Sequence, residues 1–184
     1  MSSTKRGATR ATNDFYCTPE WCVTALYETI QGPKPTLDPC AGNGGLVEPV
    51  NALYPRTQPC RGFEIQPELV ETAQMRGLPV TLSDGLAVSW IGEHIVLNPP
   101  YSEAEKWIEK AVAEAHSTVA LLRLGFLASK RRNEWMKKHP PYALVILSRR
   151  PDFTGRGGDS ADYAWFCWAK QGDLFKDTQL KWIK

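Results

Sequence analysis

The chain of 184 residues predicts one α/β domain built on a mainly parallel, doubly wound sheet with helices on both faces. Short apolar runs of strand length alternate along it with longer segments whose apolar residues recur at helical spacing. Several of these runs end in a polar or acidic residue followed by glycine or proline. Because the carboxyl ends of parallel strands meet at one edge of a sheet, and ligands bind across that edge, we expect the functional groups to collect there.

The composition is that of a globular protein, with 42% hydrophobic and 23% charged residues, and no apolar stretch approaches the roughly 20 residues that span a bilayer. Residues 1–14 are polar and basic and predict a mobile arm, followed by one domain over residues 15–184. The start of the chain lacks the apolar core of a secretory signal, and the five cysteines form no CxxC pair. We therefore expect reduced thiols, a cytoplasmic location, no membrane partner and no metal.

The first unit predicts a helix over residues 19–30, with Thr18 as its N-cap and Pro19 at its first position, and then a short strand over 36–38. That strand ends in Asp38 and leads into a glycine-rich turn at 39–45 and a helix from about residue 46. A carboxylate here would attract a cation or an amine, and the glycines would let a bulky group lie against bare backbone. A plain tight turn is the alternative for this stretch alone.

The next units repeat the pattern. Residues 60–65 predict a strand that ends in Glu64, residues 67–75 a helix, and residues 78–82 a strand followed by Asp84. An acid at the tip of the second strand is placed to accept both hydroxyls of a ribose. Three carboxylates at consecutive strand ends indicate a ligand site rather than surface decoration.

A buried strand over 94–97 delivers the tetrad Asn98-Pro99-Pro100-Tyr101 to the same edge. The two prolines stiffen the turn, so the Asn98 side-chain oxygen and the Pro99 carbonyl form two aimed acceptors beside an exposed Tyr101 ring. Such acceptors suit the two N–H groups of an aromatic amine, whose lone pair they free for attack. The tetrad therefore predicts an amine as the nucleophile.

The remaining chain predicts a helix over 103–116 capped by Ser102, a strand over 119–124, a basic helix over 129–138, and strands over 142–147 and 163–168. Residues 123–156 hold nine Lys and Arg against two acids, a net charge of +7. This favours an anionic polymer as partner, although a solvated basic helix face explains it equally well. The long loop at 148–162, rich in Arg and Gly, could wrap a phosphate backbone or be a flexible surface loop.

These motifs, in this order, closely resemble the S-adenosylmethionine-dependent amino-methyltransferases that modify adenine in DNA, and residues 121–127 and 148–158 look like the compact phage and prophage members. The resemblance implies a Rossmann-like class I methyltransferase fold, S-adenosylmethionine as cofactor, and double- or single-stranded DNA as substrate in a bacterial or phage-infected cytoplasm. It implies methylation of adenine N6 on a flipped-out base. Sequence specificity should be low or short, because the large target-recognition insertion of restriction-associated relatives is lacking.

The resemblance also assigns residues to roles. The catalytic residues would be Asn98, Pro99, Pro100 and Tyr101. The cofactor-binding residues would be Tyr16, Thr18, Pro19, Trp21, Asp38, Pro39, Cys40, Ala41, Gly42, Gly44, Glu64, Ile65, Asp84 and Asn98. From the basic segment, the long loop and the stacking argument, and not from the resemblance, we expect the acceptor to contact Tyr101, Phe126, Lys130, Arg131, Arg132, Arg149, Arg150, Phe153 and Arg156, with Phe126 or Phe153 stacking on the second face of the base.

Two other classes of function remain open from the sequence. The tetrad also occurs in methyltransferases that act on RNA adenine, on a cytosine amine or on a protein glutamine. A nucleic-acid-binding module with a vestigial cofactor pocket would keep the basic segment without the activity.

Overall fold

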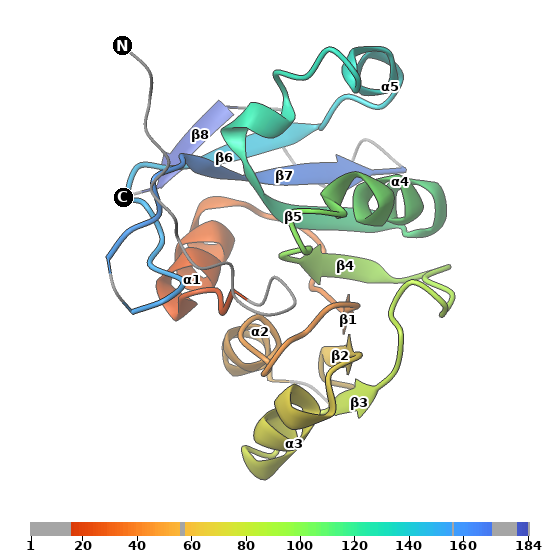
Figure 1. The fold of residues 1–184 in the computed structure, drawn as a ribbon, viewed down its shortest axis with the longest axis vertical. Coiled ribbons are helices and arrows are strands. Elements are labelled where there is room, and N and C mark those ends of the chain that lie inside the picture. Colours follow the sequence, from red (N-terminus) through yellow and green to blue (C-terminus); the bar gives the residue numbers. More distant parts are fainter. Residues whose placement is uncertain (1–15, 56–57, 156, 171–179, 184) are drawn as a thin grey trace.

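The computed structural model describes residues 16–55, 58–155, 157–170 and 180–183, so the predicted arm at 1–14 lies outside the described residues. Eight strands form one sheet in the order β3-β2-β1-β4-β5-β7-β6-β8 (Figure 1). The strands are β1 (Leu37–Asp38), β2 (Arg61–Glu64), β3 (Val80–Leu82), β4 (His94–Leu97), β5 (Ser117–Arg123), β6 (Ala143–Leu147), β7 (Tyr163–Ala169) and β8 (Leu180–Ile183).

The sheet is mainly parallel, which confirms the predicted fold class. Only β7 runs against its neighbours β5 and β6 in the described sheet; the other pairings are parallel. The strand order reverses between β1 and β4, which is where ligands bind in doubly wound folds. The carboxyl ends of β1 to β5 meet at one edge, called the carboxyl edge below. The sequence did not predict β8, which adds four residues beside β6.

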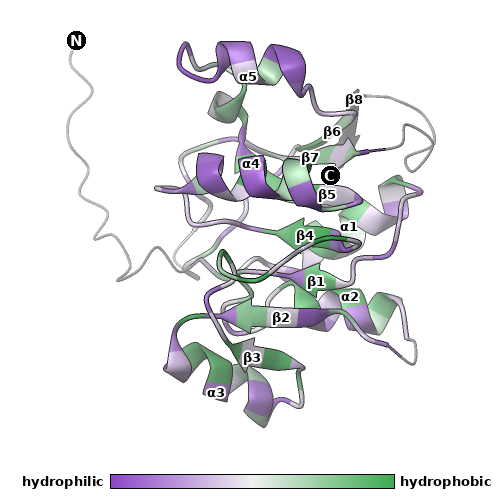
Figure 2. Ribbon diagram, turned by 90° about the vertical axis from the view of Figure 1, so that its right-hand side faces the viewer, coloured by the Kyte–Doolittle hydropathy of each residue, from purple (hydrophilic) through white to green (hydrophobic). Residues whose placement is uncertain are grey.

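Helices cover both faces of the sheet. On one face lie α1 (Glu20–Thr29), α2 (Val47–Leu53) and α3 (Pro67–Met75), and on the other lie α4 (Ala104–Glu114) and α5 (Asn133–Lys138). Two main apolar clusters result, one under α1 around Leu26 and Trp165 and the other under α4 around Ile108 and Phe166. Figure 2 shows mainly hydrophobic strands in the middle of the sheet and helices in which hydrophilic and hydrophobic residues are mixed.

Three predicted helix starts differ from the structure. The N-cap of α4 is Glu103, not the predicted Ser102, and it makes no side-chain capping bond. The N-cap of α1 is Pro19, whose ring has no acceptor for a capping bond. The hydroxyl of Thr18, the predicted N-cap, accepts a hydrogen bond from Asn98. The basic helix predicted over 129–138 is helical only over Asn133–Lys138. Arg132 holds the preceding segment as a turn by donating hydrogen bonds to the carbonyls of Phe126 and Gly125.

Candidate functional site

Two buried carboxylates form the floor of the site, at the ends of the adjacent strands β1 and β2. Asp38 is 1% exposed and Glu64 is 7% exposed. Asp38 accepts a hydrogen bond from the Cys40 amide at 3.1 Å. Burial raises the pKa of Asp38 to about 7, and the neighbouring Glu64 charge adds to the effect. Among the described residues no lysine or arginine forms an ion pair with either acid. A cationic ligand would therefore stabilise the buried negative charge of these carboxylates.

Glu64 ties the glycine-rich turn to the end of β2. One carboxylate oxygen accepts the Gly42 amide at 2.8 Å, and the other accepts the amides of Ile65 and Gln66 at 2.9 Å. An ionised carboxylate has about four acceptor positions, so room is left for a ligand hydroxyl. These hydrogen bonds fix the turn after β1 relative to the start of α3.

A cavity of about 930 Å³ opens along the carboxyl edge. Its volume is at the upper end of the roughly 300–1,000 Å³ of small-molecule sites. The structure brings together most of the predicted cofactor residues in its wall. These are Tyr16, Thr18, Asp38, Pro39, Cys40, Ala41, Gly42, Glu64, Ile65, Asp84 and Asn98.

Three predicted cofactor residues do not line the cavity. Pro19 caps α1, and the Trp21 ring lies half-buried on α1 under the Arg149 guanidinium, 5.1 Å from its centre. Gly44 faces the segment that follows α3, as a Cβ added at Gly44 would lie 2.4 Å from the Leu78 side chain. Its φ of +90° still makes it a residue that shapes the turn.

Part of the wall was missed by the sequence analysis. Ser102, Glu103, Lys106 and Trp107, which lead into and begin α4, line the cavity with Leu86. The 6% exposed Trp107 occupies an apolar helical position and therefore looked like ordinary core. Its indole N–H has no hydrogen-bond partner in the described structure. Only an unpaired buried donor distinguishes it, and no sequence pattern reports that.

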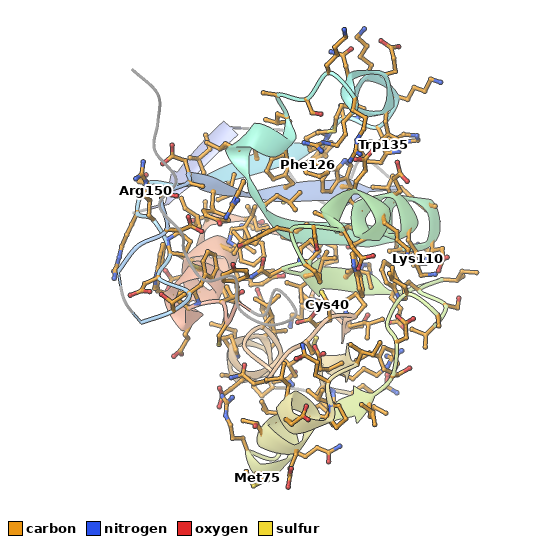
Figure 3. The ribbon with its side chains drawn as sticks, in the orientation of Figure 1. Cys40, Met75, Lys110, Phe126, Trp135 and Arg150 are labelled. Atoms are coloured by element: carbon orange, nitrogen blue, oxygen red, sulfur yellow. The ribbon has the colours of Figure 1, made fainter. Side chains whose placement is uncertain are left out.

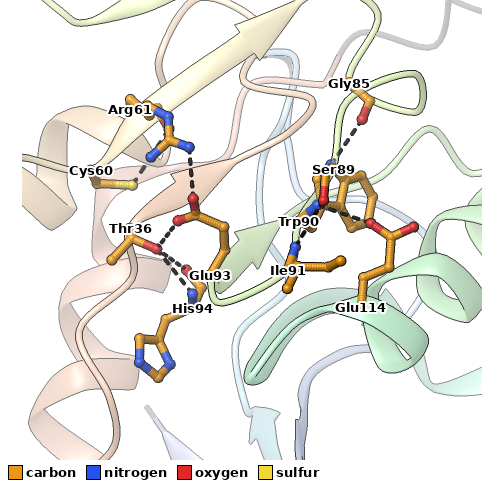
Figure 4. Close-up of polar contacts among 10 residues, drawn as sticks. All are labelled: Thr36, Cys60, Arg61, Gly85, Ser89, Trp90, Ile91, Glu93, His94 and Glu114. Atoms are coloured by element: carbon orange, nitrogen blue, oxygen red, sulfur yellow. Dashed lines mark hydrogen bonds and ion pairs between the residues drawn. The ribbon is translucent and has the colours of Figure 1, made fainter.

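The turn after β3 is held in place by a hydrogen bond from Trp90. Its indole N–H donates to the Gly85 carbonyl at 2.9 Å (Figure 4). A Cβ on Gly85 would lie 1.8 Å from the Pro39 carbonyl oxygen, so only glycine allows this approach. Asp84 is exposed at the cavity wall and accepts the Leu86 amide at 2.9 Å. The third predicted acid therefore stands in the same cavity as the other two.

Asn98 is held by its amide nitrogen. Nδ2 donates to the Tyr16 carbonyl at 3.2 Å and to the Thr18 hydroxyl at 3.1 Å. Oδ1 is buried and has no hydrogen-bond partner among the described residues. The segment before α1 thus fixes which end of the amide is free, and the free end is an acceptor.

The Tyr101 ring is not exposed, contrary to the expectation from the sequence. It lies 5.2 Å from the Tyr16 ring and 6.0 Å from the Tyr163 ring, and Phe153 approaches it edge-on at 6.5 Å. The Arg123 guanidinium lies 4.6 Å from its centre. Burial, followed by the Tyr163 hydroxyl, raises the pKa of Tyr101, so its hydroxyl stays neutral. An acceptor base could stack on this ring only after one of these neighbours moves.

Phe126 is not placed to stack on an acceptor, which corrects the prediction. It is 7% exposed and packs edge-on against Phe166 in the cluster under α4. Arg132 covers its ring at 4.3 Å. Figure 3 shows Phe126 at the turn after β5, apart from Cys40 in the cavity wall. Phe153, by contrast, lies beside Tyr101.

The predicted basic residues do not form one free patch. Arg131 and Arg132 pair with Glu105, and Arg150 pairs with Asp162. Lys130 and Arg149 are exposed and form no ion pair within the described part of the chain, and Arg156 lies outside it. The helix α5 runs away from the carboxyl edge, since the His139 carbonyl that follows it accepts from Trp168 near the far end of β7. In Figure 1, α5 and the 148–162 loop lie on different sides of the molecule.

Within the described residues, no group of three or more His, Cys, Asp or Glu side chains could hold a metal ion. No helix of that part of the chain is both long and apolar enough to cross a bilayer.

The fold is that of the class I methyltransferases. A protein of Listeria monocytogenes named as a proposed class I S-adenosylmethionine-dependent methyltransferase superposes with a TM-score of 0.60 at 15% identity, over 87% of this chain and 61% of that one. A proposed RNA methyltransferase of Pyrococcus horikoshii gives 0.62 at 14%, over 90% and 92%. The modification subunit of a proposed type I restriction enzyme of Vibrio vulnificus gives 0.59 at 15%, over 85% and 44%.

The chain thus spans less than two thirds of the Listeria and Vibrio proteins. No protein-family model matches the sequence. No curated protein matches it either.

Proposed function

We propose that this protein transfers a methyl group from S-adenosylmethionine to the exocyclic N6 amine of adenine in DNA, with low or short sequence specificity. The observation that carries the proposal is Asn98 Oδ1, a buried acceptor that has no partner among the described residues, at the wall of a cavity that suits a cationic nucleoside. Leaving a buried acceptor unpaired costs about 1–3 kcal/mol, which an amine N–H would recover on binding.

The residues present fit the cofactor. S-adenosylmethionine supplies a methyl group on a positively charged sulfonium and also carries an amino group and a ribose. Asp38, buried and in no ion pair among the described residues, would hold positive charge at the methionine end. Glu64 would accept the ribose hydroxyls, and Asp84, with Ile65 nearby, would face the adenine. The class I fold of the neighbours supports this assignment.

Asn98 would act on the acceptor amine. An aromatic amine is a weak nucleophile because its lone pair is delocalised into the ring. An acceptor that binds one of its N–H groups favours a pyramidal nitrogen with the lone pair free. The same oxygen then stabilises the positive charge that develops on nitrogen more than it stabilises the neutral amine. Because Nδ2 is held at two points, Oδ1 needs little reorganisation to do this.

Support for a nucleic acid acceptor comes from the surroundings of the tetrad. Aromatic rings that can stack on a base lie around Tyr101, and the loop that supplies one of them, Phe153, also carries the exposed Arg149 and Arg150. The Vibrio neighbour, by its name the modification subunit of a proposed type I restriction enzyme, favours DNA as the acceptor. A base enters by displacing Phe153 or Tyr16 from the ring.

The test is transfer of tritium from labelled S-adenosylmethionine to adenine-containing DNA. We expect incorporation at adenine N6, and loss of incorporation in Asn98→Ala. No transfer to DNA by the unaltered protein, or unchanged transfer by the variant, would refute the proposal.

RNA adenine is the second candidate, because a neighbour with nearly complete mutual coverage is named as a proposed RNA methyltransferase. A matched RNA oligonucleotide in the same assay separates the two, since preferential labelling of RNA would replace DNA as the acceptor. A glutamine-containing peptide in the same assay tests the alternative that the acceptor is a protein amide.

A further inference from the structure

Arg123, at the end of β5, places a cation against the ring that completes the tetrad. Its guanidinium lies 4.6 Å from the centre of the Tyr101 ring, and Nε donates to the Tyr163 hydroxyl at 3.0 Å. One terminal nitrogen reaches an Asp159 carboxylate oxygen at 3.3 Å. The side chain remains 47% exposed. Arg123 is thus oriented by aromatic residues yet open to the solvent from which an acceptor would arrive.

Asp159 depends little on this arginine. Its carboxylate also accepts the Tyr163 hydroxyl at 2.7 Å, the Ala161 amide at 3.1 Å and the Ser160 hydroxyl at 3.3 Å. Burial alone would raise the pKa of Asp159, but the hydrogen bonds and the Arg123 charge outweigh it and hold the pKa below its ordinary value. Asp159 would therefore stay ionised and hydrogen-bonded if Arg123 turned to another anion.

We infer that Arg123 binds a backbone phosphate next to the acceptor base, and that Asp159 occupies the place of that phosphate in the free protein. The inference rests on the proposed function and names the feature of the acceptor that this site recognises. A guanidinium presents parallel donors to a phosphate as it does to a carboxylate, so the exchange keeps its hydrogen bonds. A protein amide acceptor has no phosphate to offer, so this contact would favour a nucleotide.

Two substitutions separate this role from a structural one because their expected effects have opposite signs. Arg123→Gln should raise KM for a DNA oligonucleotide about tenfold and change kcat little, since it removes one charge-assisted contact. Asp159→Asn should lower KM about threefold, since it removes the competing charge and keeps the shape. If Arg123 only braced Tyr101, both substitutions would loosen the same network and impair activity together.

The chain offers a matched control at the opposite edge of the sheet. Arg61 is 46% exposed and pairs with Glu93 at 2.7 Å (Figure 4). Its guanidinium also lies 5.9 Å from the centre of the Phe63 ring, so it has the same kinds of partner as Arg123. Arg61→Gln should leave KM for DNA within twofold. Melting temperatures of all three variants report whether the fold is kept.

Binding is measured separately from transfer, by fluorescence anisotropy with labelled DNA and RNA oligonucleotides, each carrying one adenine. A neutral methylphosphonate beside that adenine should weaken binding by the unaltered protein about as much as Arg123→Gln does, and should not weaken the variant further. Transfer to DNA without this pattern would overturn the inference and leave the proposed function standing. The expected binding pattern without methyl transfer to DNA would overturn the proposed function and leave the inference about Arg123 standing. The inference about Arg123 would also be overturned if the protein bound neither polymer, or if both Arg123→Gln and Asp159→Asn lost affinity.

Discussion

Replacing Asn98 with alanine should remove the activity and leave the stability nearly unchanged. The substitution deletes two hydrogen bonds donated by Nδ2, each contributing about 0.5–1.5 kcal/mol. It also deletes the unpaired Oδ1, whose burial costs about 1–3 kcal/mol. The two effects are of similar size and opposite sign. We therefore expect the free energy of unfolding to change by no more than about 1 kcal/mol, a shift of about 2–4 °C in Tm for a chain of this length.

The catalytic effect is expected to be much larger. Removing one preorganised group that stabilises a transition state typically lowers kcat about 100- to 1,000-fold. Single-turnover transfer of labelled methyl to DNA measures this loss. Calorimetry with S-adenosylhomocysteine measures the cofactor affinity, which should stay within about threefold, because Asp38 and Glu64 remain in place.

Two results would refute this reasoning. A variant that keeps more than a tenth of the rate would mean that Oδ1 does not act on the acceptor. A loss of cofactor affinity as large as the loss of rate would mean that Asn98 serves the cofactor instead. Thr18→Val is the matched control: it removes one of the two acceptors for Nδ2 and keeps Oδ1, so the rate should fall only about tenfold.

Three further predictions concern the walls of the cavity. Because burial raises the pKa of Asp38 to about 7, the folded state keeps a proton that the unfolded chain loses near pH 4, so this group lowers stability as pH rises from about 4 to 7; urea denaturation should show that slope to be smaller in Asp38→Asn. Gly85→Ala should destabilise the fold by about 3 kcal/mol or more, because its Cβ meets a backbone carbonyl, whereas Gly125→Ala, with open space around it, should be tolerated; Tm measures both. Trp107→Phe removes an unpaired N–H and should melt within a few degrees of the unaltered protein, whereas Trp90→Phe breaks a hydrogen bond and should melt lower.

The carboxyl edge could be predicted from the sequence because it depends on local patterns. A strand that ends in an acid or an asparagine needs only its own residues to be recognised, and parallel pairing then brings Asp38, Glu64 and Asn98 to one edge. The glycine-rich turn could be predicted for the same reason. Element boundaries and the strand β8 were less accessible, because pairing across the sheet decides them.

The surroundings of Tyr101 could not be predicted because distant segments supply them. Tyr16 comes from before α1, whereas Phe153 and Tyr163 come from the loop before β7 and from β7 itself. An aromatic residue after a strand, such as Phe126, fits either a core or a stacking surface. Packing against a distant strand decides between them, because Phe126 meets Phe166 of β7 edge-on in the cluster under α4.

The charge of the basic segment shows why counting along the chain can mislead. Its net charge of +7 includes arginines that pair in space with acids from outside the segment, namely Glu105, Asp159 and Asp162. If the proposed function holds, an anionic polymer would therefore meet arginines that already have carboxylate partners. Exposed ion pairs contribute only about 0–1 kcal/mol, so a phosphate can replace those carboxylates at little cost. Binding by exchange leaves the released acids near the polymer, and for that reason the salt dependence of DNA binding should correspond to fewer contacts than the nine basic residues would suggest.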